Sequence, residues 1–240
     1  MVGAPDSTSS GASNPTVTQD DTNPSEEVPM EIEHDMAVIL RNWESPGREK
    51  PHEPFAQQIR MEEAIAIGEA ELASHGTQGF IPIDLLSIDK TKTTAYLSQN
   101  LPPNQDGQFL APIYSYWTVT LKGETMDVTL IINAVTGEMW NIDMQINPYQ
   151  NTDIPFELGA GDAMKMLSEF LDDISISSNV TMGVDSNPTS SPPSISAFQE
   201  LDGSVFAIAS IKGRRSHESD DENILLAPIG INIYLSSDAP

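Results

Sequence analysis

The clearest pattern in the chain is an alternation of apolar and polar positions from Tyr114 to Met144. On one side of its first segment lie Ser115, Trp117, Val119 and Leu121. On the other side lie Tyr114, Tyr116, Thr118, Thr120 and Lys122. Successive side chains of a strand point to opposite faces, so this alternation predicts a half-buried β-strand. Gly123-Glu124 and Thr136-Gly137 mark two turns, and the segment therefore predicts an antiparallel β-meander.

An amphipathic helix is predicted ahead of this meander, from about Met61 to Ser74. Its apolar residues recur at helical spacing: Met61, Ala64, Ile65, Gly68 and Leu72. Glu62 and Glu63 fall in the first turn, where the positive end of the helix dipole favours them. The glycine in the apolar stripe predicts a close contact between this helix and the sheet.

The second half of the chain repeats this order more weakly. Residues of the first unit, Ile59, Ala64, Ile65, Gly68 and Leu72, have counterparts at a constant offset: Leu158, Ala163, Met164, Leu167 and Leu171. They predict a second helix, which in turn suggests an internal repeat.

Strands are predicted to follow the second helix, as they follow the first. Asp202-Gly203 favours a hairpin turn between strands at Phe198–Leu201 and Val205–Ile211, and the run ENILLAPIGINIYLSS supplies a further strand. FAIASIKG, from Phe206 to Gly213, is similar to YWTVTLKG, from Tyr116 to Gly123. The stretch Asp185–Ser194 is rich in proline and serine and is predicted to be a loop. The expected fold is α+β, with two units that each pack one helix on an antiparallel β-meander, at residues 54–150 and 151–240.

Residues 1–53 form the third predicted region, a flexible acidic N-terminal tether. The region is rich in Ser, Thr, Pro, Asp and Glu, and its first basic residue is Arg41. Such a composition buries too little apolar area to offset the entropy of ordering, and disorder is expected through about Pro29. The apolar segment Met36–Trp43 is an exception, which we expect to dock on the folded body as a helix or a strand. The first residues look like the tether behind a removed signal sequence or a lipid-bearing cysteine.

Charge and composition exclude several classes of protein. There are 36 acidic and 11 basic residues, for a formal net charge of -25, so nucleic acid is repelled and is not an expected partner. The chain has no cysteine, which excludes disulfide bonds, zinc sites with thiolate ligands and cysteine nucleophiles. No run approaches the roughly 18 to 20 apolar residues of a membrane helix, and direct membrane insertion is not expected.

Two short motifs stand out in the first unit: Glu62-Glu63-Ala64-Ile65 at the start of the helix, and Asn133-Ala134-Val135-Thr136-Gly137 at the end of a strand. They resemble the helix start and the strand-turn of the PepSY-like family of extracytoplasmic domains, with Asn133 where Asp is usual. In this turn Gly137 is expected to supply a positive backbone dihedral, while Asn133 and Thr136 hydrogen-bond the local backbone. The second unit lacks the Thr-Gly turn and would be a degenerate tandem copy. The resemblance implies a secreted or surface-tethered domain that modulates peptidases or sensor proteins without catalytic residues of its own.

No catalytic motif supports an enzyme, so we predict no catalytic residues, no cofactor and no metal ligands. The four histidines are far apart in the chain: His34, His52, His75 and His217. Two acidic clusters are open alternatives for weak cation binding, Glu31–Asp35 and His217–Glu222, although solvated segments are the ordinary interpretation of both. The alternative function is an extracellular hydrolase that uses scattered carboxylates.

The leading hypothesis is therefore a non-catalytic interaction or regulatory module of the cell envelope. It would be extracellular or tethered to the cell surface, and its partner would be a protein or peptide of the envelope. If the tryptophan face of the meander is core, the other face presents a polar and aromatic surface suited to partner contact, consisting of Tyr114, Tyr116, Thr118 and Thr120. A competing interpretation is that these residues are covered by a second sheet or by Met36–Trp43. Sequence patterns leave the oligomeric state open.

Overall fold

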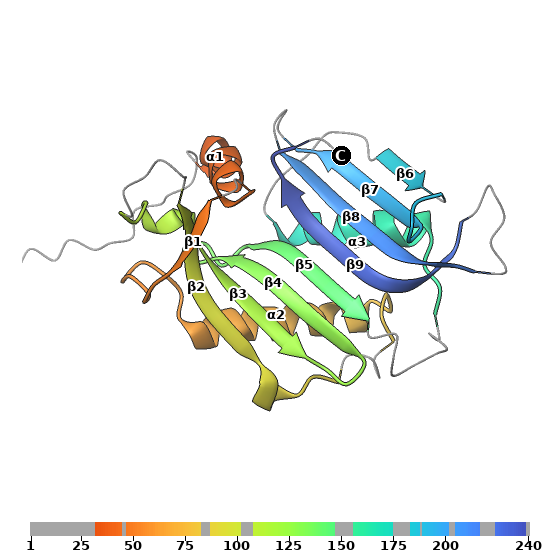
Figure 1. Ribbon diagram of the computed structural model, residues 1–240, viewed down its shortest axis with the longest axis horizontal. Coiled ribbons are helices and arrows are strands. Elements are labelled where there is room, and N and C mark those ends of the chain that lie inside the picture. The colour runs from red at the N-terminus through yellow and green to blue at the C-terminus, as the bar shows by residue number, and fades with distance from the viewer. Residues whose placement is uncertain are drawn as a thin grey trace, which may run out of the picture.

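The computed structural model describes residues 32–44, 47–82, 87–101, 108–146, 156–174, 183–187, 189–201, 205–216 and 224–238. Within these residues the fold is α+β, with three α-helices and one nine-stranded antiparallel sheet (Figure 1). The helices are α1 (Ile32–Glu44), α2 (Met61–Thr77) and α3 (Ala160–Asp173), with short 3-10 turns η2 (Lys90–Lys92) and η3 (Pro112–Tyr114). The first five strands are β1 (Arg48–Pro51), β2 (Thr94–Leu101), β3 (Ser115–Lys122), β4 (Met126–Asn133) and β5 (Met139–Ile146). The last four are β6 (Gly183–Asn187), β7 (Ser194–Glu200), β8 (Phe206–Arg215) and β9 (Leu226–Ser236).

The sheet is continuous from one end of the molecule to the other. Its strand order is β1-β2-β3-β4-β5-β9-β8-β7-β6, and every neighbouring pair is antiparallel. β5 and β9 meet in the middle, with Ile142 opposite Ile233 and Met144 opposite Ile231. The sheet therefore crosses the boundary that was predicted near residue 150.

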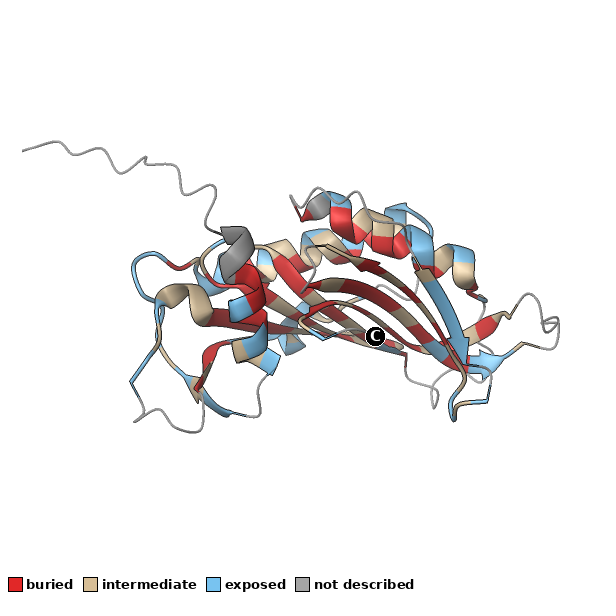
Figure 2. Cartoon of the chain, turned by 90° about the horizontal axis from the view of Figure 1, so that it is seen from above, coloured by how far each residue is buried: buried red, intermediate tan, exposed pale blue. Residues whose placement is uncertain are grey.

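Two helices cover one face of the sheet, which we call the covered face. α2 contacts β2 and β3, and α3 contacts β7 and β8 (Figure 1). Beneath them a row of paired residues crosses the sheet, and each of its side chains is at most 1 % exposed: Val119, Leu130, Ile142, Ile233, Ala209 and Ala197. Figure 2 shows this burial along the strands. Apolar residues that alternate along each strand thus build one core beneath both helices.

α1 lies on the opposite face, which we call the open face. It contacts β2 near the edge of the sheet, η3, and the central strand β9. Its C-terminal residue Glu44 accepts hydrogen bonds from Ser237, including one from the backbone N–H at 3.0 Å. Apart from α1, none of the described helices packs on this face.

The predicted first helix is confirmed, and so is the role of its glycine. A Cβ atom added to Gly68 would overlap Cδ1 of Leu130, so this residue allows α2 to lie close to β4. Met61 was wrongly placed on the core side, because it begins the helix and is 42 % exposed.

The second helix is also confirmed, and its predicted stripe is correct at Ala163, Leu167 and Leu171 but wrong at Met164. Met164 is 37 % exposed, whereas Met166 and Phe170 are each 1 % exposed. The buried residues follow the alternating three- and four-residue spacing of a helix face: Ala163, Met166, Leu167, Phe170, Leu171 and Ile174. The constant offset from the first helix predicts Met164 on this face, but Met166 occupies it.

Most of the predicted strands are confirmed, with two corrections. Asp185, Ser186 and Asn187 were expected in a loop, but they belong to β6 and pair with β7. Backbone hydrogen bonds to a neighbouring strand stabilise this segment despite its low intrinsic strand propensity. The two similar segments also hold different positions in the order of strands. YWTVTLKG lies in the second strand after α2, and FAIASIKG lies in the third strand after α3.

The described part of residues 1–53 is folded onto the body. The apolar segment Met36–Trp43 lies within α1, and Arg48–Pro51 forms the edge strand β1. The expected docking of Met36–Trp43 is confirmed, because α1 buries apolar side chains, whereas the tether interpretation is wrong for Arg48–Pro51, which pairs with β2. The predicted disorder through Pro29 concerns residues outside the described part.

Candidate binding site on the open face

The open face carries a row of polar side chains that crosses seven strands. Strand pairing aligns them in the order Thr120, Thr129, Asp143, Asn232, Ser210, Ser196 and Asp185. Each residue is half-buried or exposed, while its neighbours along β4, β5 and β9 point into the core. The alternation that builds the core thus places hydroxyl, amide and carboxylate groups together on the other side.

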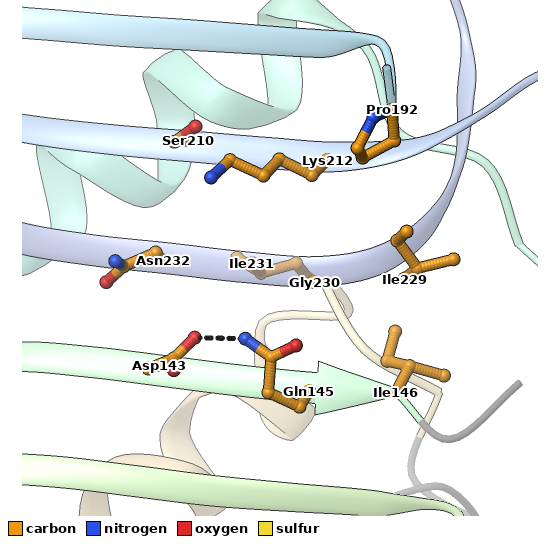
Figure 3. A pocket seen from close by; sticks show the side chains of 10 residues that line it. All are labelled: Asp143, Gln145, Ile146, Pro192, Ser210, Lys212, Ile229, Gly230, Ile231 and Asn232. Carbon is orange, nitrogen blue, oxygen red and sulfur yellow. Dashed lines mark hydrogen bonds between the residues drawn. The ribbon is translucent and has the colours of Figure 1, made fainter.

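A hollow of about 530 Å³ lies in the middle of this face, over the seam between β5 and β9 (Figure 3). Its polar lining comes from three adjacent strands: Asp143 and Gln145 from β5, Asn232 from β9, and Ser210 and Lys212 from β8. Ile146, Ile229 and Pro192 add apolar atoms. Gly230 lies between Gln145 and Lys212 in the register, and a Cβ atom there would approach Gln145 Oε1 to 3.4 Å. The missing side chain keeps this position clear.

Several polar groups of the hollow retain hydrogen-bonding capacity. Gln145 Nε2 donates to Asp143 Oδ1 at 2.7 Å, which orients the carboxylate. Asn232 Oδ1 is buried, and no donor from the described residues reaches it. Ser210 Oγ accepts from Ser196 Oγ at 3.1 Å, so its own proton is available. Among the described residues Lys212 makes no ion pair. The hollow can therefore bind a ligand that presents both donors and an anionic group.

The residues predicted for partner contact are divided between surface and interior. Tyr116 and Thr118 are only 4 % and 6 % exposed, whereas Tyr114 and Thr120 are half-buried. The ring of Trp43 from α1 meets Tyr116 edge-on, with ring centroids 6.4 Å apart. Partner contact stays a prediction for this set, and the burial of Tyr116 and Thr118 restricts its accessible part to Tyr114 and Thr120.

A second polar cluster was not foreseen from the sequence. Nε2 of His52 lies 3.0 Å from Oγ of Ser115, and Gln99 Nε2 donates to the same oxygen at 2.8 Å. A histidine beside a serine hydroxyl suggests a base and its nucleophile, but Ser115 and Gln99 are fully buried. A substrate cannot reach this hydroxyl, and the cluster instead anchors the segment after β1 to the sheet. Because His52 and Ser115 are far apart in sequence, no local pattern could have indicated their contact.

The turn on which the PepSY-like resemblance depends has the predicted geometry. Gly137 has a φ of 75°, and Asn133 Oδ1 accepts from the backbone N–H groups of Val135 and Thr136 at 2.8 and 3.0 Å. Thr136 Oγ1 accepts from the N–H of Glu138 at 3.2 Å. Asn133 Nδ2 also donates to the Ile113 carbonyl at 3.1 Å, a bond that a carboxylate at this position could not make.

The remaining candidates provide no site within the described residues. His217–Glu222 lies outside that part of the chain, and so do the side chains of the cluster Glu31–Asp35. In the described regions, no three His, Asp or Glu side chains gather closely enough to hold a metal ion. None of the described helices is long and apolar enough to cross a membrane.

Together these features define an α+β protein whose antiparallel sheet is covered by two helices on one face and carries a polar hollow on the other. No family model, no curated protein and no solved structure was found to match the chain.

Proposed function

We propose that the protein is a non-catalytic interaction module of the cell envelope, extracellular or tethered to the cell surface, that binds a protein or peptide on its open face. A peptidase or a sensor protein is the partner class that we favour. The observation that carries the proposal is the central hollow, where Asn232 and Lys212 lack partners among the described residues. Polar groups of this kind favour occupation by a ligand that supplies the missing hydrogen bonds.

The PepSY-like resemblance supports the envelope location and the regulatory role. Its two motifs lie at the start of α2 and in the turn between β4 and β5, both within the predicted first unit. We extend this proposal to two units, each with one helix on an antiparallel β-meander. In support, β2 to β5 follow α2 and β6 to β9 follow α3, and each set of four runs in sequence order toward the middle of the sheet. The last strands of the two sets, β5 and β9, would then form the seam on which the hollow lies.

Site-specific photo-crosslinking in cells that produce the protein tests the proposed binding face. A photoreactive amino acid is placed at Thr129 or Gln145 on the open face, and at Glu62 on the exposed side of α2 as the matched control. We expect one discrete envelope adduct from the two open-face positions and none from Glu62. Excess unlabelled protein should suppress this adduct. Equal labelling from Glu62, or no adduct from either open-face position, contradicts the proposal.

A further inference from the structure

We infer that the hollow between β5 and β9 binds a short peptide with free termini, about three residues long. Lys212 would bind its carboxylate, and Asp143 with Asn232 would bind its ammonium group. This inference rests on the proposed function, because it assigns the ligand chemistry of the same open face.

The carboxylate end of the hollow is formed by β8. Lys212 is the one basic residue among the described residues that line the hollow, and its side chain extends along β8 on the Ser210 side (Figure 3). With no acidic partner among the described residues, its ammonium group is free to pair with an anion. The Ser210 hydroxyl, two residues earlier on the same face, has a proton to donate to the same group. Lysine and hydroxyl donors together suit a carboxylate.

The ammonium end is formed by β5 and β9. Asp143 lies directly opposite Asn232 in the register, so a carboxylate and an amide oxygen are adjacent. Asn232 Oδ1 is buried and lacks a donor from the described residues, and a buried acceptor without a donor is costly. Gln145 holds Asp143 through its 2.7 Å hydrogen bond. An ammonium group carries three N–H donors and can satisfy both oxygens at once.

The spacing of the two ends sets the length of the ligand. β5 and β8 are separated by β9, and strands in a sheet lie about 4.8 Å apart, so Asp143 lies roughly 10 Å from Ser210, with Asn232 between them on β9. An extended chain advances about 3.4 Å per residue, so a tripeptide spans a similar distance. Gly230 lies next to this course on β9, opposite Lys212, and carries no side chain that would obstruct it. Ile146 and Ile229 offer contact to an apolar middle side chain.

Net charge favours a zwitterion over other carboxylate ligands. The chain carries a formal charge of -25, so a peptide with additional acidic residues is repelled before it reaches Lys212. A peptide with one ammonium and one carboxylate group has no net charge and escapes this repulsion. It also matches the hollow, where Lys212 and Asp143 are opposite charges.

Isothermal titration calorimetry with alanyl-leucyl-alanine tests the inference. The free tripeptide is compared with its C-terminal amide and its N-acetyl form, on the wild-type chain and on Lys212→Ala and Asp143→Asn. A charge-assisted contact predicts a loss of affinity of about ten- to a hundredfold on amidation or in Lys212→Ala. The two losses should not add, because both remove the same ion pair. N-acetylation and Asp143→Asn should form a second non-additive pair.

The matched control is Lys92→Ala, which removes a lysine that is exposed in η2 and pairs with Asp89 away from the hollow. We expect it to bind the tripeptide as the wild type does. The inference is overturned if the wild type does not bind the tripeptide, or if the amide binds as tightly as the free acid. Neither result requires a variant to fold. A photo-crosslinked partner at Gln145 in a chain that does not bind the tripeptide would refute this ligand while leaving the proposed function intact.

Discussion

Tyr116 illustrates how the surroundings of a single residue depend on a distant part of the chain. It lies on the polar side of β3, yet Trp43 covers its ring and Asn100 Oδ1 lies 3.4 Å from its hydroxyl. Burial raises the pKa of the Tyr116 hydroxyl above its usual value, and the negative charge of Glu49 adds to this effect. The neutral tyrosine is thus favoured in the folded state.

This raised pKa predicts a loss of stability at alkaline pH. A group whose pKa is higher in the folded state contributes stability that is fully present below its unfolded-state pKa, about 10 for tyrosine, and is lost as pH rises above it. The free energy of unfolding, measured by urea titration, should fall above pH 10 and fall less steeply in Tyr116→Phe. Tyr114→Phe is the matched control, because it removes a tyrosine hydroxyl that does not contribute to the raised pKa of Tyr116. An identical alkaline slope in Tyr116→Phe and wild type would contradict the predicted effect of burial.

At the scale of elements, two of the glycines inside the helices, Gly68 and Gly161, behave oppositely. Gly68 lies where α2 approaches β4, and an added Cβ would overlap Leu130. Gly161 lies in the first turn of α3, and no atom is within 4 Å of its added Cβ. Alanine is intrinsically the better helix former at both positions, so any difference between them measures packing.

Gly68→Ala should therefore destabilise the protein by about 1 to 3 kcal/mol, as overpacking does in well-packed cores. Gly161→Ala should stabilise it by about 0.5 to 1 kcal/mol. Urea unfolding of both variants against wild type measures the two effects. A stabilising Gly68→Ala would mean that α2 lies farther from the sheet than the structure has it.

At the scale of the whole molecule, the two halves share one core. A single cluster of buried residues includes Leu40 from α1, Leu130 from β4, Phe170 from α3 and Ile233 from β9. Because no break divides this cluster, we expect one cooperative unfolding transition. The β5–β9 seam should transmit a local loss of packing to both halves.

Ile233→Ala tests this coupling. Ile233 is fully buried opposite Ile142, and its truncation should cost about 2 to 5 kcal/mol. The three tryptophans, Trp43, Trp117 and Trp140, all precede residue 151, where the predicted second unit begins. Their fluorescence transition in urea should nevertheless shift together with far-UV circular dichroism. A fluorescence transition that stays in place while circular dichroism separates into two steps would show that the halves unfold independently.

Local patterns in the sequence determined much of the secondary structure and of the core. Helix α2 and the strands β3 to β5 followed from periodicity, since side chains repeat every 3.6 residues in a helix and every two in a strand. The turn at Asn133–Gly137 followed from its residue chemistry, because Gly137 tolerates a positive φ and Asn133 can hydrogen-bond its own backbone. The polar side of the meander was also correctly separated from its core side. These features depend on neighbours a few residues away.

Tertiary structure alone decided which surfaces are covered and where polar groups meet. The pairing of β5 with β9 joins strands about 80 residues apart in the chain, from Ile146 to Leu226, and it brings Asp143 beside Asn232 although neither lies in a motif. The docking of α1 buries Tyr116, and pairing with β7 makes β6 a strand in spite of its composition. Contacts between distant segments depend on which strand edges and helix faces are complementary. This complementarity produces no periodic pattern in the sequence. For this reason the core could be predicted from the order of residues, whereas the hollow on the open face became visible only in the folded chain.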